Sequence, residues 1–258
     1  MSKAYFGNNV EVLECLSFDK TVETLLSQKT DAIIMAIENS IAGSIIPNYA
    51  LIDEYNLHIV GEYYLNVQHN LMALKGQNIE DINEVYSHPM ALLQCKEFFK
   101  NYLKIKLIED KDTAEVAKRI SDHKLKNIAA IASDLSAEIY GLNILAESIQ
   151  TIKHNETRFV IVKRENHEIQ KPAINKASLK LELDHKRGSL AAILNVMSDC
   201  KLNLTKIQSL PKINTPWKYA FFVDVTFTEY EHYQKAIAIM KIMAVEMKVL
   251  GEYKNAKL

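Results

Sequence analysis

The stretch Ala36-Ile37-Glu38-Asn39-Ser40-Ile41-Ala42-Gly43-Ser44 closes an apolar run with three consecutive polar side chains. Residues 32–37 are predicted to form a β-strand, and a strand that ends in such residues is typical of open α/β sheets. Ligands of these sheets bind beyond the carboxyl ends of strands, where backbone N–H groups can hold an anion. Turn chemistry alone also explains Glu38, Asn39 and Ser40. A binding role therefore requires matching polar groups from elsewhere in the chain.

The composition is that of a globular protein without a preference for polyanions. Hydrophobic residues make up 48% of the chain, and 31 Lys and Arg residues face 32 Asp and Glu residues. This balance disfavours nucleic acid and anionic membranes as partners. Three widely spaced cysteines fit reduced thiols, residues 39–52 form an uncharged run too short to span a bilayer, and the N-terminus lacks a signal pattern. We therefore expect a cytoplasmic protein.

The spacing of glycines and histidines argues against common cofactor sites. The seven glycines never fall close enough together for a dinucleotide or P-loop fingerprint, and the eight histidines lack the spacing of a helical zinc site. We expect neither a cofactor nor a metal.

Alternating β-rich and helical patterns predict parallel α/β sheets in the first part of the chain. Apolar runs at 58–64 and 65–74, interrupted by Gln68-His69-Asn70, indicate a strand that crosses between two lobes. Hydroxyl residues at three strand-to-helix junctions are predicted as helix caps, at Ser87, Thr113 and Ser133. The predicted strands are 10–15, 32–37, 84–87, 105–108 and 128–132, and the predicted helices surround Thr21 to Leu26, 49–55, 91–102, 113–123 and Leu135 to Ile139.

The last third of the chain is predicted to be a separate domain. Residues 166–176 are charged, contain Pro172 and lack apolar periodicity, as in a linker. Residues 177–258 follow the order βαββαβ, with strands at 177–183, 203–211, 217–226 and 247–253 and helices at 189–200 and 230–244. This order predicts a ferredoxin-like sandwich. Gly188, immediately before the first helix, leaves free N–H groups suited to a carboxylate.

Three segments together resemble the prephenate dehydratase family, whose members make phenylpyruvate on the route to phenylalanine. They are Glu38-Asn39-Ser40 with Gly43, Ser87-His88-Pro89 leading to Gln94-Cys95, and Asn155-Glu156-Thr157-Arg158-Phe159. The resemblance implies a periplasmic-binding-protein-like catalytic domain at 1–165, followed by an ACT domain at 177–258. Lobe one would comprise 1–66 and 153–165, lobe two would comprise 67–152, and the substrate cleft would lie between them.

The resemblance also implies roles for individual residues. Thr157 would assist departure of the ring hydroxyl, Asn39, Ser40, Ser87 and Gln94 would donate hydrogen bonds to prephenate, and Gly43 would shape the loop. Arg158 would pair with a substrate carboxylate or brace the cleft, Phe159 would pack against it, and Glu38 would orient the loop because a bare carboxylate repels a dianion. Aromatisation drives the reaction, so no cofactor is required.

Phenylalanine is the effector that the resemblance implies, bound where ACT domains pair in a homodimer or tetramer. The residues expected at this site are Gly188, Ser189, Leu190, Asn203, Leu204, Gln208 and Ser209. Gly188-Ser189-Leu190-Ala191 replaces the usual Gly-Ala-Leu, and Gln208-Ser209-Leu210-Pro211 replaces Glu-Ser-Arg-Pro. The second replacement removes two charges that would brace the effector site.

The start of the chain also departs from the family. Members open with a strand and a glycine-rich loop, whereas Met1-Ser2-Lys3-Ala4-Tyr5-Phe6-Gly7 matches only the end of the helix after that loop. A lobe without its first strand would leave a neighbouring strand unpaired, so we expect low stability and weak activity for the chain as written. Two alternatives remain open: an arogenate dehydratase, and a non-catalytic protein that senses aromatic metabolites.

Overall fold

A computed structural model describes residues 1–165, 173–211 and 219–257. The predicted linker therefore lies outside the described residues up to position 172, as does Trp217 at the start of a predicted strand. The chain forms two compact units. Unit 1 comprises Met1–Asn39, Gly43–Leu65 and Thr157–Leu258, and unit 2 comprises Ser40–Ala42 and Asn66–Glu156.

Unit 1 contains a four-stranded sheet in the order β2-β1-β9-β3. Its strands are β1 (Ile33–Asn39), β2 (Gly43–Ser44), β3 (His58–Asn66) and β9 (Glu156–Lys163), and its helices are α1 (Ser2–Phe6), α2 (Phe18–Leu26) and α3 (Ile46–Glu54). Strand β1 runs antiparallel to β9, and on its other edge β2 pairs only with Glu38 and Asn39. The βαβ pattern favoured parallel strands here, but β1 is antiparallel to both of its neighbours, because β9 returns from a distant part of the chain.

The strand predicted at 10–15 is absent from the structure, which describes this whole segment. Its apolar side chains lie in solvent, with Val12 at 48% and Leu13 at 53% exposure. An apolar run becomes a strand only where a neighbouring strand accepts its backbone hydrogen bonds. The local pattern predicted the strand, but the fold offers this segment no such neighbour.

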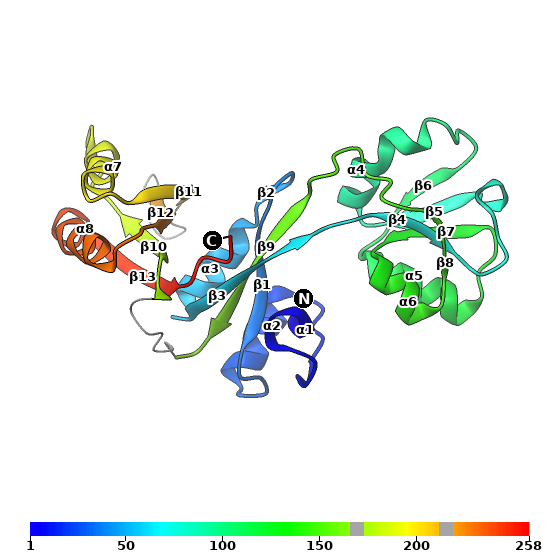
Figure 1. The fold of residues 1–258 in the computed structure, drawn as a ribbon, viewed down its shortest axis with the longest axis horizontal. Coiled ribbons are helices and arrows are strands. Elements are labelled where there is room, and N and C mark those ends of the chain that lie inside the picture. Colours follow the sequence, from blue (N-terminus) through cyan, green and yellow to red (C-terminus); the bar gives the residue numbers. More distant parts are fainter. Residues whose placement is uncertain (166–172, 212–218, 258) are drawn as a thin grey trace. The chain divides into compact units, whose positions relative to one another are not determined.

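The C-terminal part of unit 1 has the predicted ferredoxin-like order. Its elements are β10 (Lys176–Glu182), α7 (Ser189–Asp199), β11 (Asn203–Pro211), β12 (Tyr219–Thr226), α8 (Tyr230–Met243) and β13 (Glu246–Tyr253). The sheet order is β11-β12-β10-β13, and all its pairs are antiparallel. Helices α7 and α8 pack on one face (Figure 1). The βαββαβ prediction is therefore confirmed.

The other face of the ferredoxin-like sheet packs against the first sheet of unit 1. Val160 and Val162 of β9 share a core with Phe222 of β12 and Leu250 of β13. The two sheets approach so closely at Gly251 that an added Cβ would lie 2.1 Å from the Ile59 carbonyl oxygen. The two sheets therefore pack directly against each other within unit 1.

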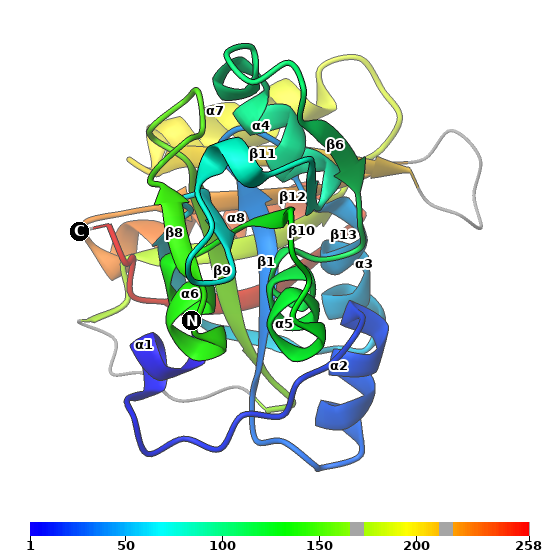
Figure 2. The ribbon, with the colours of Figure 1, turned by 90° about the vertical axis from the view of Figure 1, so that its right-hand side faces the viewer.

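Unit 2 is built on a five-stranded sheet in the order β6-β5-β7-β4-β8. Strand β5 is parallel to β6 and β7, and β4 is antiparallel to β7 and β8. Helix α4 covers one face, and α5 and α6 cover the other (Figures 1 and 2). The elements are β4 (Asn70–Ala73), η1 (Ile79–Asp81), β5 (Glu84–Ser87), α4 (Pro89–Phe99), β6 (Lys106–Glu109), α5 (Thr113–His123), β7 (Ile128–Ala132), α6 (Asp134–Tyr140) and β8 (Asn143–Ala146).

Side-chain alternation along the strands explains the two cores of unit 2. Leu71 faces the core beneath α4, and its neighbour Met72 faces the core beneath α5 and α6. Both side chains are fully buried. The sequence pattern missed β8, because its side chains are only partly buried and its polar start hides a strand pattern.

The predicted helix caps are confirmed at one junction of three. Ser133 accepts a hydrogen bond from the backbone N–H of Ser136 and caps α6. Helix α4 is capped instead by His88 Nδ1, and α5 by the carboxylate of Asp112. Thr113 is already the first residue of α5, and the Ser87 hydroxyl donates to the Ile131 carbonyl instead. Among the described residues, no helix is long and apolar enough to cross a membrane.

Candidate active site

Asn39 and Thr157 are two of the predicted site residues that lie in unit 1. They are register partners at the ends of β1 and β9, and Asn39 Nδ2 donates a hydrogen bond of 3.0 Å to Thr157 Oγ1. Both side chains are partly buried. Because Oγ1 accepts this bond, the hydroxyl keeps its own proton for donation to another acceptor. The antiparallel pairing thus brings together two predicted site residues that lie 118 positions apart.

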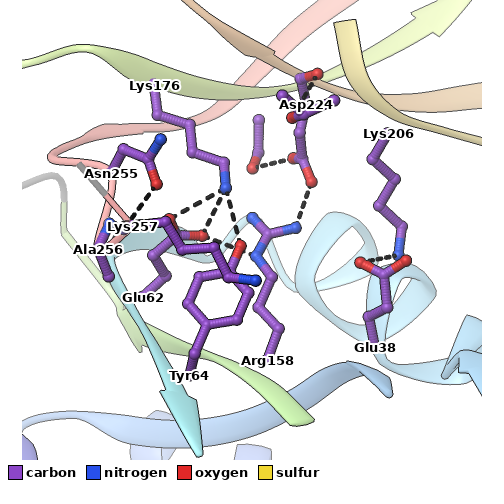
Figure 3. Close-up of polar contacts among 12 residues, drawn as sticks. Glu38, Glu62, Tyr64, Arg158, Lys176, Lys206, Asp224, Asn255, Ala256 and Lys257 are labelled. Carbon is purple, nitrogen blue, oxygen red and sulfur yellow. Dashed lines mark hydrogen bonds and ion pairs between the residues drawn. The ribbon is translucent and has the colours of Figure 1, made fainter. Parts of the chain in front are cut away.

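Arg158 faces away from this pair, since successive strand residues point to opposite faces. Its side chain is 5% exposed, and Nη1 pairs with Asp224 (Figure 3). Nε donates to Glu62 at 2.7 Å, and Nη2 donates to the Tyr253 hydroxyl at 2.8 Å. All three guanidinium nitrogens therefore bind protein groups. Of the two roles expected for Arg158, these contacts with β3 and the ferredoxin-like sheet favour bracing over pairing with a substrate carboxylate.

Further ions and hydroxyls complete this buried group, which we call the ionic cluster: Glu62, Arg158, Lys176, Ser178, Asp224 and Tyr253. Lys176 Nζ lies 2.8 Å from a Glu62 oxygen, and the Ser178 hydroxyl donates to Asp224. Burial works against the charge of Asp224, but Arg158, Ser178 and Lys176 outweigh it and hold the pKa of the carboxyl below its usual value. Burial, followed by repulsion from Arg158, lowers the pKa of Lys176. The charge of each member therefore depends on the charges of the other members.

Glu38 also faces the ferredoxin-like sheet. Its carboxylate lies 3.0 Å from Lys206 Nζ on β11, and that ammonium group sits 5.1 Å from the centre of the Tyr49 ring. Burial lowers the pKa of Lys206, and the nearby negative charge of Glu38 opposes this effect. The structure thus gives Glu38 a cationic partner within the protein.

Gln94 lies at the centre of a small group of polar side chains in unit 2. Its Oε1 accepts hydrogen bonds from His69 Nε2 at 2.8 Å and Asn155 Nδ2 at 2.9 Å. The amide oxygen is thereby occupied, so the N–H groups of Gln94 point away from these partners. We call Gln94, His69 and Asn155 the amide cluster.

His69 is a further candidate site residue, which was not predicted from the sequence. Burial lowers the pKa of its imidazole, and the hydrogen bond to Gln94 opposes this shift. The neutral ring donates from Nε2, because Gln94 offers its carbonyl oxygen there. The polar interruption Gln68-His69-Asn70 within an apolar run was the signal that could have identified it.

The remaining predicted donors of unit 2 behave differently from one another. Ser40 is exposed, and its Oγ accepts a bond of 2.9 Å from the Glu156 N–H, which leaves its proton for another acceptor. Ser87 is fully buried and donates its proton to the Ile131 carbonyl at 2.7 Å. Its expected role as a donor to substrate is therefore corrected to a bond between β5 and β7.

Gly43 and Phe159 of unit 1 take structural positions. Gly43 adopts φ +83°, in the left-handed region that strains other residues, so it permits the reversal between β1 and β2. Phe159 is partly buried and lies on the same strand face as Thr157. Burial raises the pKa of the Cys95 thiol, next to Gln94, to about 12, as expected for an inert core cysteine.

The residues predicted for the effector divide between two places. Ser189 and Leu190 line a cavity of about 120 Å³ together with residues 183–186, Tyr219 and Phe221. Gly188 precedes α7 with φ +86°. Asn203, Leu204, Gln208 and Ser209 lie on β11 and are absent from the cavity wall. Within the described parts of the chain, no group of three or more His, Cys, Asp or Glu residues could hold a metal ion.

Comparison with known proteins identifies the family. Residues 1–167 match the family described as prephenate dehydratase. The chain belongs to the prephenate dehydratase family. It is 38% identical over 261 residues to arogenate dehydratase/prephenate dehydratase 2, chloroplastic, of Arabidopsis thaliana, covering 97% of this chain and 68% of that protein. The resemblance drawn from the three sequence segments is thus confirmed.

Solved structures share the prephenate dehydratase fold over nearly the whole chain. A prephenate dehydratase from Arthrobacter aurescens in complex with L-Phe has a TM-score of 0.83 and 25% identity, covering 95% of this chain and 82% of that one. A protein described as a novel type of quorum-quenching acylase has a TM-score of 0.88 and 25% identity, covering 99% of this chain and 93% of that one. The predicted fold class is therefore confirmed.

Proposed function

We propose that this protein is a prephenate dehydratase, and the observation that carries the proposal is the Asn39–Thr157 hydrogen bond. In the reaction, the bond from the ring to its carboxylate breaks and releases carbon dioxide. The electron pair enters the ring, the bond from the ring to its hydroxyl breaks, and phenylpyruvate and hydroxide result. Aromatisation supplies the driving force, so the protein has to orient the substrate and stabilise the departing oxygen.

Thr157 donates its proton in a hydrogen bond to the departing hydroxide. A Thr hydroxyl is too weak an acid for full proton transfer at neutral pH, but hydrogen-bond donation to developing charge needs no transfer. Asn39 donates to Oγ1 and directs the Thr157 proton away from β1. Gln94 and Ser40 act as neutral donors to prephenate, since the remaining donors of each are left free by their protein contacts.

The test is an assay of phenylpyruvate formation from prephenate, with arogenate assayed in parallel for phenylalanine formation. Prephenate is expected to be the faster substrate, and Thr157→Val is expected to abolish most of the turnover. A folded protein that converts neither substrate would overturn the proposal and favour a non-catalytic sensor. Faster conversion of arogenate would assign the amine-bearing substrate instead.

Phenylalanine is the effector that we propose for the ferredoxin-like domain, which would act as an ACT domain in a cytoplasmic homodimer or tetramer. The ferredoxin-like topology and the cavity beside Ser189 and Leu190 support this assignment. Calorimetry of phenylalanine binding, together with light scattering, tests it. Absence of binding to the assembled protein would contradict the effector role without affecting the catalytic proposal.

A further inference from the structure

Four charges connect the site strands to the ferredoxin-like sheet. Glu38 and Arg158 are register partners on β1 and β9, and Lys206 and Asp224 are register partners on β11 and β12. Glu38 pairs with Lys206, and Arg158 pairs with Asp224. Two neighbouring strands of one sheet therefore meet two neighbouring strands of the other through opposite charges. We call these four residues the charge rectangle.

The charge rectangle is largely shielded from water. The side chains of Arg158, Asp224 and Lys206 are 5%, 3% and 6% exposed, whereas that of Glu38 is 37% exposed. Shielded charges interact strongly and resist separation, because a charge left without its partner in such a place is costly. Strands β11 and β12 are thus fixed opposite the ends of β1 and β9.

Each residue that β1 and β9 contribute to the rectangle is the immediate neighbour of a proposed catalytic group. Glu38 precedes Asn39, and Arg158 follows Thr157. Alternation along a strand places one residue of each couple on the ferredoxin-like side and the other on the opposite side. A shift of the charged side chains moves the same stretch of backbone that carries Asn39 and Thr157.

We propose that Glu38 and Arg158 are positioning residues through which the ferredoxin-like sheet holds the Asn39–Thr157 pair in its reactive geometry. The proposal rests on the proposed function of that pair. It makes Lys206 and Asp224, outside the catalytic lobes, determinants of turnover. Small misplacements of a catalytic donor cost much of its effect, so loss of one ion pair is expected to reduce turnover even in a folded protein.

A second group of ion pairs provides a control, because it attaches the two sheets to each other without touching the strands that carry Asn39 and Thr157. Lys180 on β10 and Lys248 on β13 both pair with Asp53 on α3, at 2.7 Å and 3.1 Å. These ion pairs also join the ferredoxin-like domain to the first sheet's layer, but Asp53 belongs to neither β1 nor β9. Attachment alone predicts similar effects for loss of Lys206 and loss of Asp53, whereas positioning predicts an effect on turnover only for Lys206.

The experiment compares Lys206→Met, Lys206→Arg and Asp53→Asn in the full chain. Lys206→Met is expected to lower kcat for prephenate about tenfold or more with little change in KM, Lys206→Arg to restore most of it, and Asp53→Asn to keep kcat within about twofold. All assays are run below the melting temperature of the least stable variant. Unchanged kcat in Lys206→Met, or an equal loss in Asp53→Asn, would overturn the proposal.

Hydrogen exchange supplies a second measurement that does not depend on activity. Peptides covering 33–40 and 156–160 are expected to exchange faster in Lys206→Met than in wild type, and to be unchanged in Asp53→Asn. Unaltered exchange of both peptides in Lys206→Met would contradict the positioning role. Failure of the proposed function is recognised separately: the variants then show this exchange pattern, but the wild-type protein forms no phenylpyruvate.

Discussion

The ionic cluster of unit 1 and the amide cluster of unit 2 are both buried polar groups, but their chemistry differs. The ionic cluster joins Arg158, Lys176, Glu62 and Asp224 through charged contacts. In the amide cluster, one neutral oxygen of Gln94 accepts from a neutral ring and an amide. Arg158 of the ionic cluster follows Thr157 in the sequence, and Gln94 of the amide cluster is itself proposed to act on substrate.

This difference indicates that the two clusters have different functions. Separating buried ions leaves an uncompensated charge and costs several kcal/mol, so the ionic cluster suits a permanent attachment. A neutral hydrogen bond contributes only about 1 kcal/mol net and can be exchanged for another at small cost. The amide cluster therefore suits a surface that binds and releases a ligand, and the predictions below test this contrast.

The largest expected effect is on stability, for Arg158→Met. Removal of the guanidinium leaves the buried Glu62 and Asp224 with fewer cationic partners, and breaking a buried pair typically costs about 3–5 kcal/mol. Urea unfolding monitored by circular dichroism measures the loss. Arg119→Met is the control: Arg119 pairs with Asp110 near the surface, where ion pairs contribute about 0–1 kcal/mol. Equal losses of stability in the two variants would show that the ionic cluster contributes no more than an ion pair near the surface.

Thr157→Val should affect rate more than stability. The substitution preserves shape and removes the hydroxyl, and loss of one such donor typically costs about 3 kcal/mol, a factor of about a hundred in kcat. Thr157→Ser retains the hydroxyl and should keep most of the activity. Steady-state assays with prephenate distinguish the variants. Normal turnover in Thr157→Val would show that another group assists the leaving hydroxide.

His69→Phe tests the amide cluster. It removes the Nε2–H donor that orients Gln94, and loss of a neutral hydrogen bond of about 1 kcal/mol predicts a fall of about five- to tenfold in kcat/KM for prephenate. His69→Gln places an amide N–H near the position of Nε2 and should recover part of the loss. If Phe and Gln behave alike at this position, the orientation of Gln94 does not depend on His69.

Acid titration should have the smallest effect, because at neutral pH the contribution of Asp224 is constant. Its pKa is lowered in the folded protein below the ordinary 3.8, so the unfolded chain binds more protons in acid. The stability from this carboxylate is complete above pH 3.8 and decreases as the pH falls through the lower, folded-state pKa. Urea unfolding of wild type and Asp224→Asn between pH 5 and pH 2 measures the difference. If the stability of the two proteins falls in parallel with pH, the lowered pKa of Asp224 is contradicted.

Much of the fold was predictable because the information is local. The βαββαβ pattern of the C-terminal part, helix α5 and strand β7 each follow from a repeat of apolar residues within one element. The three segments around Glu38, Ser87 and Thr157 together also indicate the family, because each motif is local in the sequence. In contrast, the predicted strand at 10–15 failed for want of a partner strand, which its own residues cannot specify.

The candidate site shows the same contrast between local sequence information and long-range contacts. The sequence by itself singled out Asn39 and Thr157 as candidate site residues, and strand alternation separates Thr157 from Arg158. Only the tertiary structure decided what Arg158 contacts, because Glu62 lies 96 positions away and Asp224 lies 66 away. A periodic pattern records which face of an element is buried. The partner of a buried charge is set by long-range packing, where distance and desolvation select among all the opposite charges of the chain.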